Sequence, residues 1–86
     1  MLVENFVIQN KTGLHARPAS LFVKKASGFK CHVKIRKDET EVDAKSMLSV
    51  LTLGAGKGAE VTITTDGEDE QEAMKGLIQL LQEIKE

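Results

Sequence analysis

The chain has 86 residues and carries 12 Lys and Arg against 13 Asp and Glu, which gives a formal net charge of −1. A chain of this length buries roughly 60–65% of its unfolded surface, which supports one hydrophobic core but not two. We therefore predict one domain over residues 1–86. Cys31 has no second cysteine to pair with, and the two histidines are too few to complete a four-ligand metal site, so no disulfide, metal or cofactor is expected.

Membrane insertion, secretion and nucleic-acid binding are also disfavoured. The apolar runs fall far short of the ~20 residues of a membrane-spanning helix. Glu4 and Asn5 interrupt the N-terminal segment where a signal peptide would have its apolar stretch. With no Trp, no Tyr and three Phe, the chain lacks the aromatic residues that stack on bases. We expect a soluble, cytoplasmic protein that neither enters a membrane nor binds nucleic acid.

The charges are unevenly distributed along the chain. Residues 1–43 carry eight basic and five acidic side chains, whereas residues 44–86 carry four basic and eight acidic ones. The basic side chains of the first half can form a merely solvated face, or they can form a docking surface for an acidic partner.

The first two elements are a strand and a helix. Residues 2–8 alternate between apolar and polar sides as a half-buried strand does. Residues 16–27 repeat apolar side chains at helical spacing, and Gly28 follows where a helix ends. Pro18 is tolerated only in the first turn, because it has no N–H to donate within a helix, so the helix begins within about one residue of His15.

The later elements follow from the same periodicities. They are strands over residues 31–36, 40–43 and 60–66, and helices over 47–53 and from about residue 70 nearly to the C-terminus. Ser46 is suited to cap the helix at 47 and Gly54 to end it, and Asp69 with Glu72 has the spacing of a capping box. The side chains expected to face the core are Cys31, Val33, Ile35, Val61, Ile63, Ala73, Met74, Leu77, Ile78, Leu81 and Ile84.

The predicted order is therefore βαββαβα. Strands with one apolar face, joined in part by a hairpin, favour a largely antiparallel four-stranded sheet. The three helices then cover one face and leave the other to solvent. This is an α/β fold of the α+β type, an open-faced two-layer sandwich.

His15 is the first candidate functional residue, because it stands directly before a helix. The free backbone N–H groups of a first helical turn attract anions, so a phosphoryl group on the imidazole could accept hydrogen bonds from the N–H groups of Ala16 and Arg17. The Arg17 guanidinium adds a fixed cation. A lone histidine at such a junction can equally be an unusual helix cap, so the pattern by itself indicates only a histidine placed to carry an anion.

A longer motif surrounds this histidine. Gly13-Leu14-His15-Ala16-Arg17-Pro18-Ala19 resembles the active-site signature of HPr, the histidine-containing phosphocarrier family of the bacterial phosphoenolpyruvate-dependent sugar phosphotransferase system. The resemblance extends over essentially the whole chain, through Lys45-Ser46, Met47-Leu48, Val50, Leu53-Gly54, Ala73-Met74, Leu77 and Leu81.

The resemblance implies a role and two partners. His15 would be phosphorylated on Nδ1 by enzyme I and would pass the group to a histidine of an enzyme IIA protein during sugar uptake. The protein would be a phosphoryl carrier and covalent intermediate, not an enzyme with its own turnover, and we expect a monomer. The family's docking surface around the histidine corresponds here to Ser20, Lys24, Ser27, Met47, Leu48 and Leu51. Met47 and Leu48 could instead be core residues of a short amphipathic helix.

Ser46 has a structural and a regulatory interpretation. The structural one is the helix cap already described. In family members from low-GC Gram-positive bacteria, the matching serine is phosphorylated by an ATP-dependent HPr kinase/phosphorylase, which reduces transfer through the histidine and promotes binding to a catabolite-control transcription factor. Such members typically have Ile-Met-Gly after the serine, where this chain has Met47-Leu48-Ser49.

Three alternatives to the carrier stay open. One is a purely regulatory HPr-like protein acting through Ser46, although in such proteins the active-site histidine is replaced. Another is a phosphocarrier of the nitrogen-related branch, with the same histidine chemistry and different partners. The third, a small adaptor or nucleic-acid-binding domain, is disfavoured by the near-neutral charge. Of the remaining residues, we expect His32 on the solvent side of its strand and Cys31 in the core.

Overall fold

The computed structural model describes residues 1–85, which form four strands and three helices in the predicted order. The elements are β1 (Leu2–Val7), α1 (Ala16–Ser27), β2 (His32–Lys37), β3 (Thr40–Asp43), α2 (Met47–Thr52), β4 (Glu60–Asp66) and α3 (Glu70–Glu83). Each lies within a residue or two of its expected bounds. The predicted order and fold class are confirmed.

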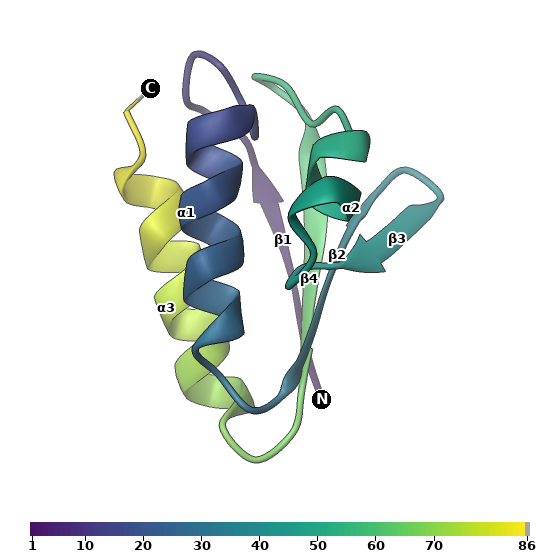
Figure 1. Cartoon of the computed structure of the whole chain (residues 1–86), viewed down its shortest axis with the longest axis vertical. Coiled ribbons are helices and arrows are strands. Elements are labelled where there is room, and N and C mark those ends of the chain that lie inside the picture. The colour runs from purple at the N-terminus through teal and green to yellow at the C-terminus, as the bar shows by residue number, and fades with distance from the viewer. Residues whose placement is uncertain (86) are drawn as a thin grey trace.

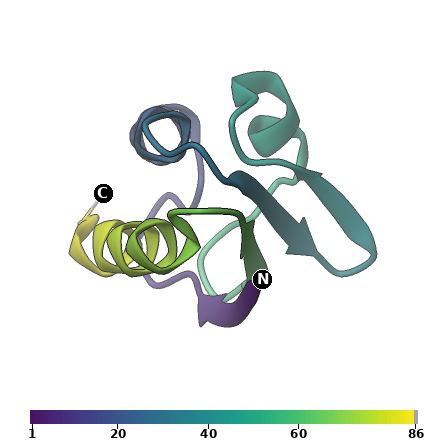
Figure 2. The same ribbon diagram turned by 90° about the horizontal axis from the view of Figure 1, so that it is seen from below.

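The four strands form a single sheet in the order β1-β4-β2-β3, and every neighbouring pair is antiparallel (Figure 1). Strand β4 is central and pairs with β1 on one side and with β2 on the other. All three helices lie on the same side of this sheet, as the view along the molecule shows (Figure 2). The opposite face is left uncovered, so the sandwich has two layers.

The core lies between the sheet and the helices. Strands β2 and β4 alternate between buried and accessible side chains, and Val33, Ile35, Val61 and Ile63 are each at most 1% exposed. This period of two follows from the pleat of a strand, which sends successive side chains to opposite faces. The predicted inward residues are therefore correct, including Cys31, which is 2% exposed.

Helix α1 begins where Pro18 requires. His15 is its N-cap and Pro18 its third residue, so no hydrogen bond of the helix depends on the missing N–H. Phe22 and Ala26 are fully buried and belong to the hydrophobic core. Gly28 takes the C-cap position as predicted, but with φ −78° it keeps a right-handed conformation that any residue could adopt.

The capping box predicted at the start of α3 is wrong. Asp69 is the N-cap but makes no capping hydrogen bond with its side chain, and the carboxylate instead accepts the backbone N–H groups of Lys30 and Cys31 at 2.8 and 2.9 Å. These donors lie just before β2, so the carboxylate joins the start of α3 to the start of a strand. The apolar stripe of α3 is confirmed: Ala73, Met74, Leu77 and Leu81 are buried, and Ile78 and Ile84 are half-buried.

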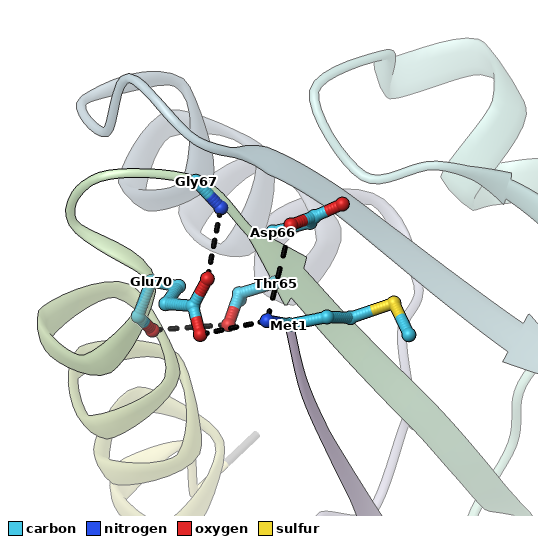
Figure 3. Close-up of polar contacts among 5 residues, drawn as sticks. All are labelled: Met1, Thr65, Asp66, Gly67 and Glu70. Carbon is cyan, nitrogen blue, oxygen red and sulfur yellow. Dashed lines mark hydrogen bonds and ion pairs between the residues drawn. The ribbon is translucent and has the colours of Figure 1, made fainter.

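A second carboxylate holds the turn between β4 and α3 (Figure 3). Glu70 accepts the N–H of Gly67 at 3.0 Å and lies 2.9 Å from the amino group of Met1. These two donors lower the pKa of Glu70. The hydroxyl of buried Thr65 donates to the backbone carbonyl of Glu70 at 3.0 Å, so this turn is held from both sides.

Asp69 predicts a pH dependence of stability. The N–H groups of Lys30 and Cys31 lower the pKa of Asp69 below its ordinary value of 3.8. A carboxyl whose pKa is lower in the folded state stabilises the fold above its unfolded pKa, and loses that effect as the pH falls through the folded value. We expect Asp69→Asn to lower the urea midpoint at neutral pH, and the difference from wild type to shrink towards about pH 2.

Circular dichroism is the suitable measurement, because the chain has no Trp or Tyr. Glu68→Gln is the matched control, since Glu68 is exposed and adjacent to Asp69. Equal midpoints for Asp69→Asn and wild type at neutral pH would show that the Asp69 contacts contribute nothing to stability.

Candidate functional site

His15 is exposed at the N-terminus of α1. Its backbone is extended, with φ −82° and ψ −172°, and its carbonyl accepts the N–H of Ala19 at 2.8 Å. The imidazole makes no capping hydrogen bond. The histidine therefore occupies the cap position through its backbone, while the side chain is not used as the helix cap.

The first turn of α1 provides a positive environment next to this imidazole. Ala16 and Arg17 are its first two residues, and backbone N–H groups at these positions have no acceptor within a helix. The turn contains no acidic side chain. A helix of 12 residues carries the partial positive charge of its macrodipole at this end. Ala16, Arg17 and His15 thus lie together, all exposed, as the sequence predicts.

The loop before His15 is firmly held. The side-chain amide of Asn10 donates to the carbonyl of Gly13 at 2.8 Å, and the N–H of Gly13 donates back to the carbonyl of Asn10 at 3.2 Å. The N–H of Leu14 donates across the molecule to the carbonyl of Ala55 at 2.8 Å. Asn10 and Leu14 are buried, at 7% and 3% exposure. An exposed imidazole is therefore carried on an ordered backbone.

Gly13 is required where this loop meets the segment after α2. Its φ is +65°, in the left-handed region that favours glycine. A Cβ placed there would lie 2.4 Å from the carbonyl oxygen of Ala55 and 2.6 Å from the Cα of Gly56. These are backbone atoms, which cannot swing aside as a flexible side chain can. Two backbones approach each other closely here because this position has no side chain.

A shallow hollow opens beside His15. Its lining consists of Thr12, Leu14, His15, Leu51, Gly54, Ala55 and Gly56. Figure 1 shows the start of α1 and the end of α2 at the same end of the molecule. The sequence analysis does not connect residues 54–58 with His15 and does not single out Thr12. The one feature of the sequence that marks this segment is its three glycines within five residues.

A wider hollow lies on the open face of the sheet and includes none of the predicted site residues. Its lining includes His32, Lys34 and Arg36, which alternate along β2 on the solvent side. His32 is exposed, as predicted. Of these two hollows, the smaller one at His15 combines a histidine with a helix N-terminus, which is the arrangement that the sequence predicts.

The predicted docking residues lie on α1 and on the neighbouring α2. Ser20, Lys24 and Ser27 are exposed on α1. On α2, Leu48 is 74% and Leu51 is 37% exposed, although both are apolar. Met47 differs from them, because it is half-buried and packs against the core. The core face of α2 is supplied by Val50 and Leu53.

Leu21 is a further exposed apolar residue of α1, with 42% exposure. Sequence reasoning missed it. Its spacing from Phe22 and Ala26 places it off the buried face of the helix, and this was the available signal.

Ser46 is the N-cap of α2, as predicted. Its Oγ accepts the N–H of Ser49 at 3.4 Å, and the residue is half-buried. The preceding Lys45 donates from Nζ to the carbonyl of Phe29 at 2.8 Å, which joins the start of α2 to the segment after α1. Cys31 is buried, and burial, followed by the Asp69 carboxylate, raises the pKa of its thiol.

Within residues 1–85, no group of three or more His, Cys, Asp and Glu side chains is arranged to hold a metal ion. Among the helices of this part of the chain, none is long and apolar enough to cross a bilayer.

The fold and the site together define a class of protein: a small open-faced sandwich that presents one histidine at a helix N-terminus, where an anionic group can be held at the surface. The family model described as "PTS HPr component phosphorylation site" matches residues 3–83. The chain belongs to this HPr family of phosphocarriers.

Individual relatives agree with that assignment. The phosphocarrier protein HPr of Cupriavidus necator is 46% identical over 81 residues, which cover 94% of this chain and 91% of the relative. Among solved structures, HPr-C-His from Thermoanaerobacter tengcongensis superposes with a TM-score of 0.93 at 44% identity, covering 95% of this chain and 92% of that one.

The chain is also similar to a second kind of relative. The Bacillus subtilis catabolite repression protein Crh, described as a dimer with a swapped domain, has a TM-score of 0.77 at 42% identity and covers 100% of this chain and 99% of its own.

The close approach at Gly13 predicts a strong effect of a single methyl group. We expect Gly13→Ala to lower the free energy of unfolding by about 2–5 kcal/mol, from left-handed strain and overpacking against backbone. Gly56→Ala is the matched control, because a Cβ there meets nothing within 4 Å. It should stay within about 0.5 kcal/mol of wild type in urea unfolding. Equal effects of the two substitutions would contradict a specific close approach at Gly13.

Proposed function

We propose that this chain accepts a phosphoryl group from enzyme I on Nδ1 of His15 and passes it to an enzyme IIA protein during sugar uptake. The observation that carries the proposal is the exposed His15 imidazole beside the first-turn N–H groups of Ala16 and Arg17, in a chain of the HPr family. The hydrogen-bonded loop before it fixes the backbone that carries the imidazole.

The transfer asks little of the carrier itself. The Nδ1 lone pair of neutral His15 attacks phosphorus, a P–N bond forms, and the bond from phosphorus to the donor's leaving group breaks in line. Phosphoryl transfer depends mainly on positioning and on stabilising the charge of the oxygens. The N–H groups of Ala16 and Arg17 and the Arg17 guanidinium supply hydrogen bonds and positive charge to those oxygens.

Exposure of the site suits a carrier. A group that must be received and then released cannot be bound so tightly that the second transfer slows, because stabilising the phosphorylated state raises the barrier to leaving it. One arginine and one helix terminus provide moderate stabilisation. Each partner can supply the rest of the surroundings, since His15 is open to solvent.

The docking surface proposed for these partners spans α1 and α2. It consists of Ser20, Lys24, Ser27, Met47, Leu48 and Leu51. The exposed Leu48 and Leu51 provide an apolar centre, and Lys24 with Arg17 provides positive charge at its border. Such a surface fits an acidic partner face with an apolar spot, and a small contact area suits short-lived complexes.

Regulation through Ser46 is the second candidate function. The similarity to Crh, whose description refers to catabolite repression, favours it. We propose that an HPr kinase/phosphorylase modifies Ser46 and that the modified form binds a catabolite-control transcription factor. A phosphate brings about −1.5 to −2 charges beside the docking surface, which repels an acidic partner. His15 is retained, so regulation would act together with the carrier role.

Oligomeric state, location and branch belong to the same proposal. We infer a cytoplasmic location and a monomer, in which β1 pairs with β4 of its own chain over six residues. A carrier of the nitrogen-related branch is the alternative, with the same His15 chemistry and other partners. No contact with nucleic acid is invoked in either case.

Transfer to His15 is tested by intact mass after incubation with phosphoenolpyruvate, Mg²⁺ and enzyme I. We expect one acid-labile phosphoryl group on wild type and none on His15→Ala, while Arg17→Ala should be phosphorylated about ten- to a hundredfold more slowly, from the loss of charge-assisted hydrogen bonds. No label on folded wild type, with enzyme I active on another acceptor, would overturn the carrier role.

The effect of charge at Ser46 is tested by a pair of variants. Aspartate and asparagine cap helices equally well, so Ser46→Asp and Ser46→Asn differ mainly in charge. We expect Ser46→Asp to raise the KM for transfer from enzyme I several-fold at low salt, less at high salt, and Ser46→Asn to resemble wild type. Identical kinetics for the two variants would contradict electrostatic regulation from this position.

A further inference from the structure

Lys37 has an unusual place for a charged residue. It is the last residue of β2, and the alternation of that strand puts it on the same face as Val33 and Ile35, which are 1% and 0% exposed. The residue is half-buried. Its side chain thus begins on the helix-covered side of the sheet, unlike Lys34 and Arg36, which are exposed on the other side.

The ammonium group of Lys37 reaches the end of α2. Its Nζ donates to the carbonyl of Leu53 at 3.4 Å and to the carbonyl of Gly54 at 3.3 Å. The last carbonyls of a helix have no donor within the helix and carry partial negative charge, so a lysine there is stabilising. Lys37 therefore anchors the backbone at the point where the chain leaves α2.

The segment that starts at this anchor supports the His15 loop. The carbonyl of Ala55 accepts the N–H of Leu14 at 2.8 Å. At the far end, the N–H of Gly58 donates to the carbonyl of Ile8 at 2.7 Å, and the carbonyl of Ala59 accepts the N–H of Ile8 at 2.8 Å. Three hydrogen bonds therefore join residues 55–59 to residues 8–14.

This segment has few side chains of its own to hold it. Three of the residues between 54 and 58 are glycines, and a Cβ added to any of them would meet nothing within 4 Å. Ala55 is the buried residue among them, at 3% exposure. Backbone contacts and the Lys37 anchor must then supply the order that packing supplies elsewhere.

We propose that Lys37 is a positioning residue for His15. It holds Leu53 and Gly54, so that the carbonyl of Ala55 stays in place under Leu14 and the imidazole keeps its position at the start of α1. An effect of Lys37 on the rate of phosphoryl transfer rests on the proposed function of His15. Lys37 touches no transferred group and lies outside the proposed docking surface, so it acts on the site only through the backbone.

Lys37→Met tests the proposal, because methionine keeps an apolar stem of similar length and removes the donor. We expect hydrogen exchange of the Leu14 amide to become about two- to tenfold faster, the factor that corresponds to one or two net hydrogen bonds. Amides of β4 and α1, such as those of Ile63 and Phe22, should exchange at wild-type rates. Unchanged exchange at Leu14, or an equal increase throughout the chain, would overturn the proposal.

Two further variants separate positioning from charge. Lys34→Met removes a lysine from the opposite face of β2 and should leave Leu14 exchange unchanged. Lys37→Arg keeps a cationic donor and should restore it to within about twofold of wild type. An effect of Lys34→Met as large as that of Lys37→Met would also overturn the proposal, because net charge and not the anchor would then be responsible.

Phosphoryl acceptance gives an independent readout. The carrier is kept limiting, and phosphorylated enzyme I is varied in excess. We expect Lys37→Met to lower the maximal transfer rate about three- to tenfold, while the KM for enzyme I stays unchanged, because the docking residues are intact. A change in KM alone would contradict a positioning role. If wild type accepts no phosphoryl group, the proposed function fails, and the Leu14 exchange measurement still decides whether Lys37 holds the loop.

Discussion

The position of His15 depends on one close contact, in which the backbone of Gly13 and Leu14 lies directly on that of Ala55 and Gly56. The contact needs a glycine with φ +65° and brings a buried amide onto a carbonyl at 2.8 Å. An unsatisfied amide at that position would be costly. The loop is thereby held in place, and the helix that follows begins at a defined residue.

The ordered backbone before His15 and the exposed imidazole serve different needs of a phosphocarrier. Asn10 and Leu14, which precede His15, are buried and hydrogen-bonded, whereas the imidazole and the first two residues of α1 are open to solvent. A rigid backbone lowers the entropic cost of bringing the imidazole in line with a donor. An open side chain allows donor and acceptor to approach the same atom in turn. Regulation from Ser46 would act on that approach and leave the imidazole itself unchanged.

Basic and acidic side chains are concentrated at different places in the fold. Residues 5–37 contain no acidic side chain, and this stretch includes the whole of α1. Five of the 13 acidic residues lie between positions 66 and 72, around the turn before α3, which is at the end of the molecule away from the start of α1 (Figure 1). There Asp69 and Glu70 accept backbone N–H groups and stabilise the fold. The proposed docking surface thus has a positive character on α1, since α1 carries Arg17, Lys24 and Lys25 and no carboxylate.

Sequence alone determined the order of elements, the inward faces of β2 and β4, and the start of α1 at His15, because periodicity and the missing N–H of Pro18 act within a few residues. The partners of Asp69, 38 and 39 residues away, and those of Lys37, 16 and 17 residues away, were decided only by the tertiary structure. Local spacing predicted a capping box for Asp69 and gave no prediction for the contacts of Lys37. Which backbone atoms a charged side chain reaches depends on how the strands and helices pack, and a pattern of neighbouring residues contains no measure of that packing.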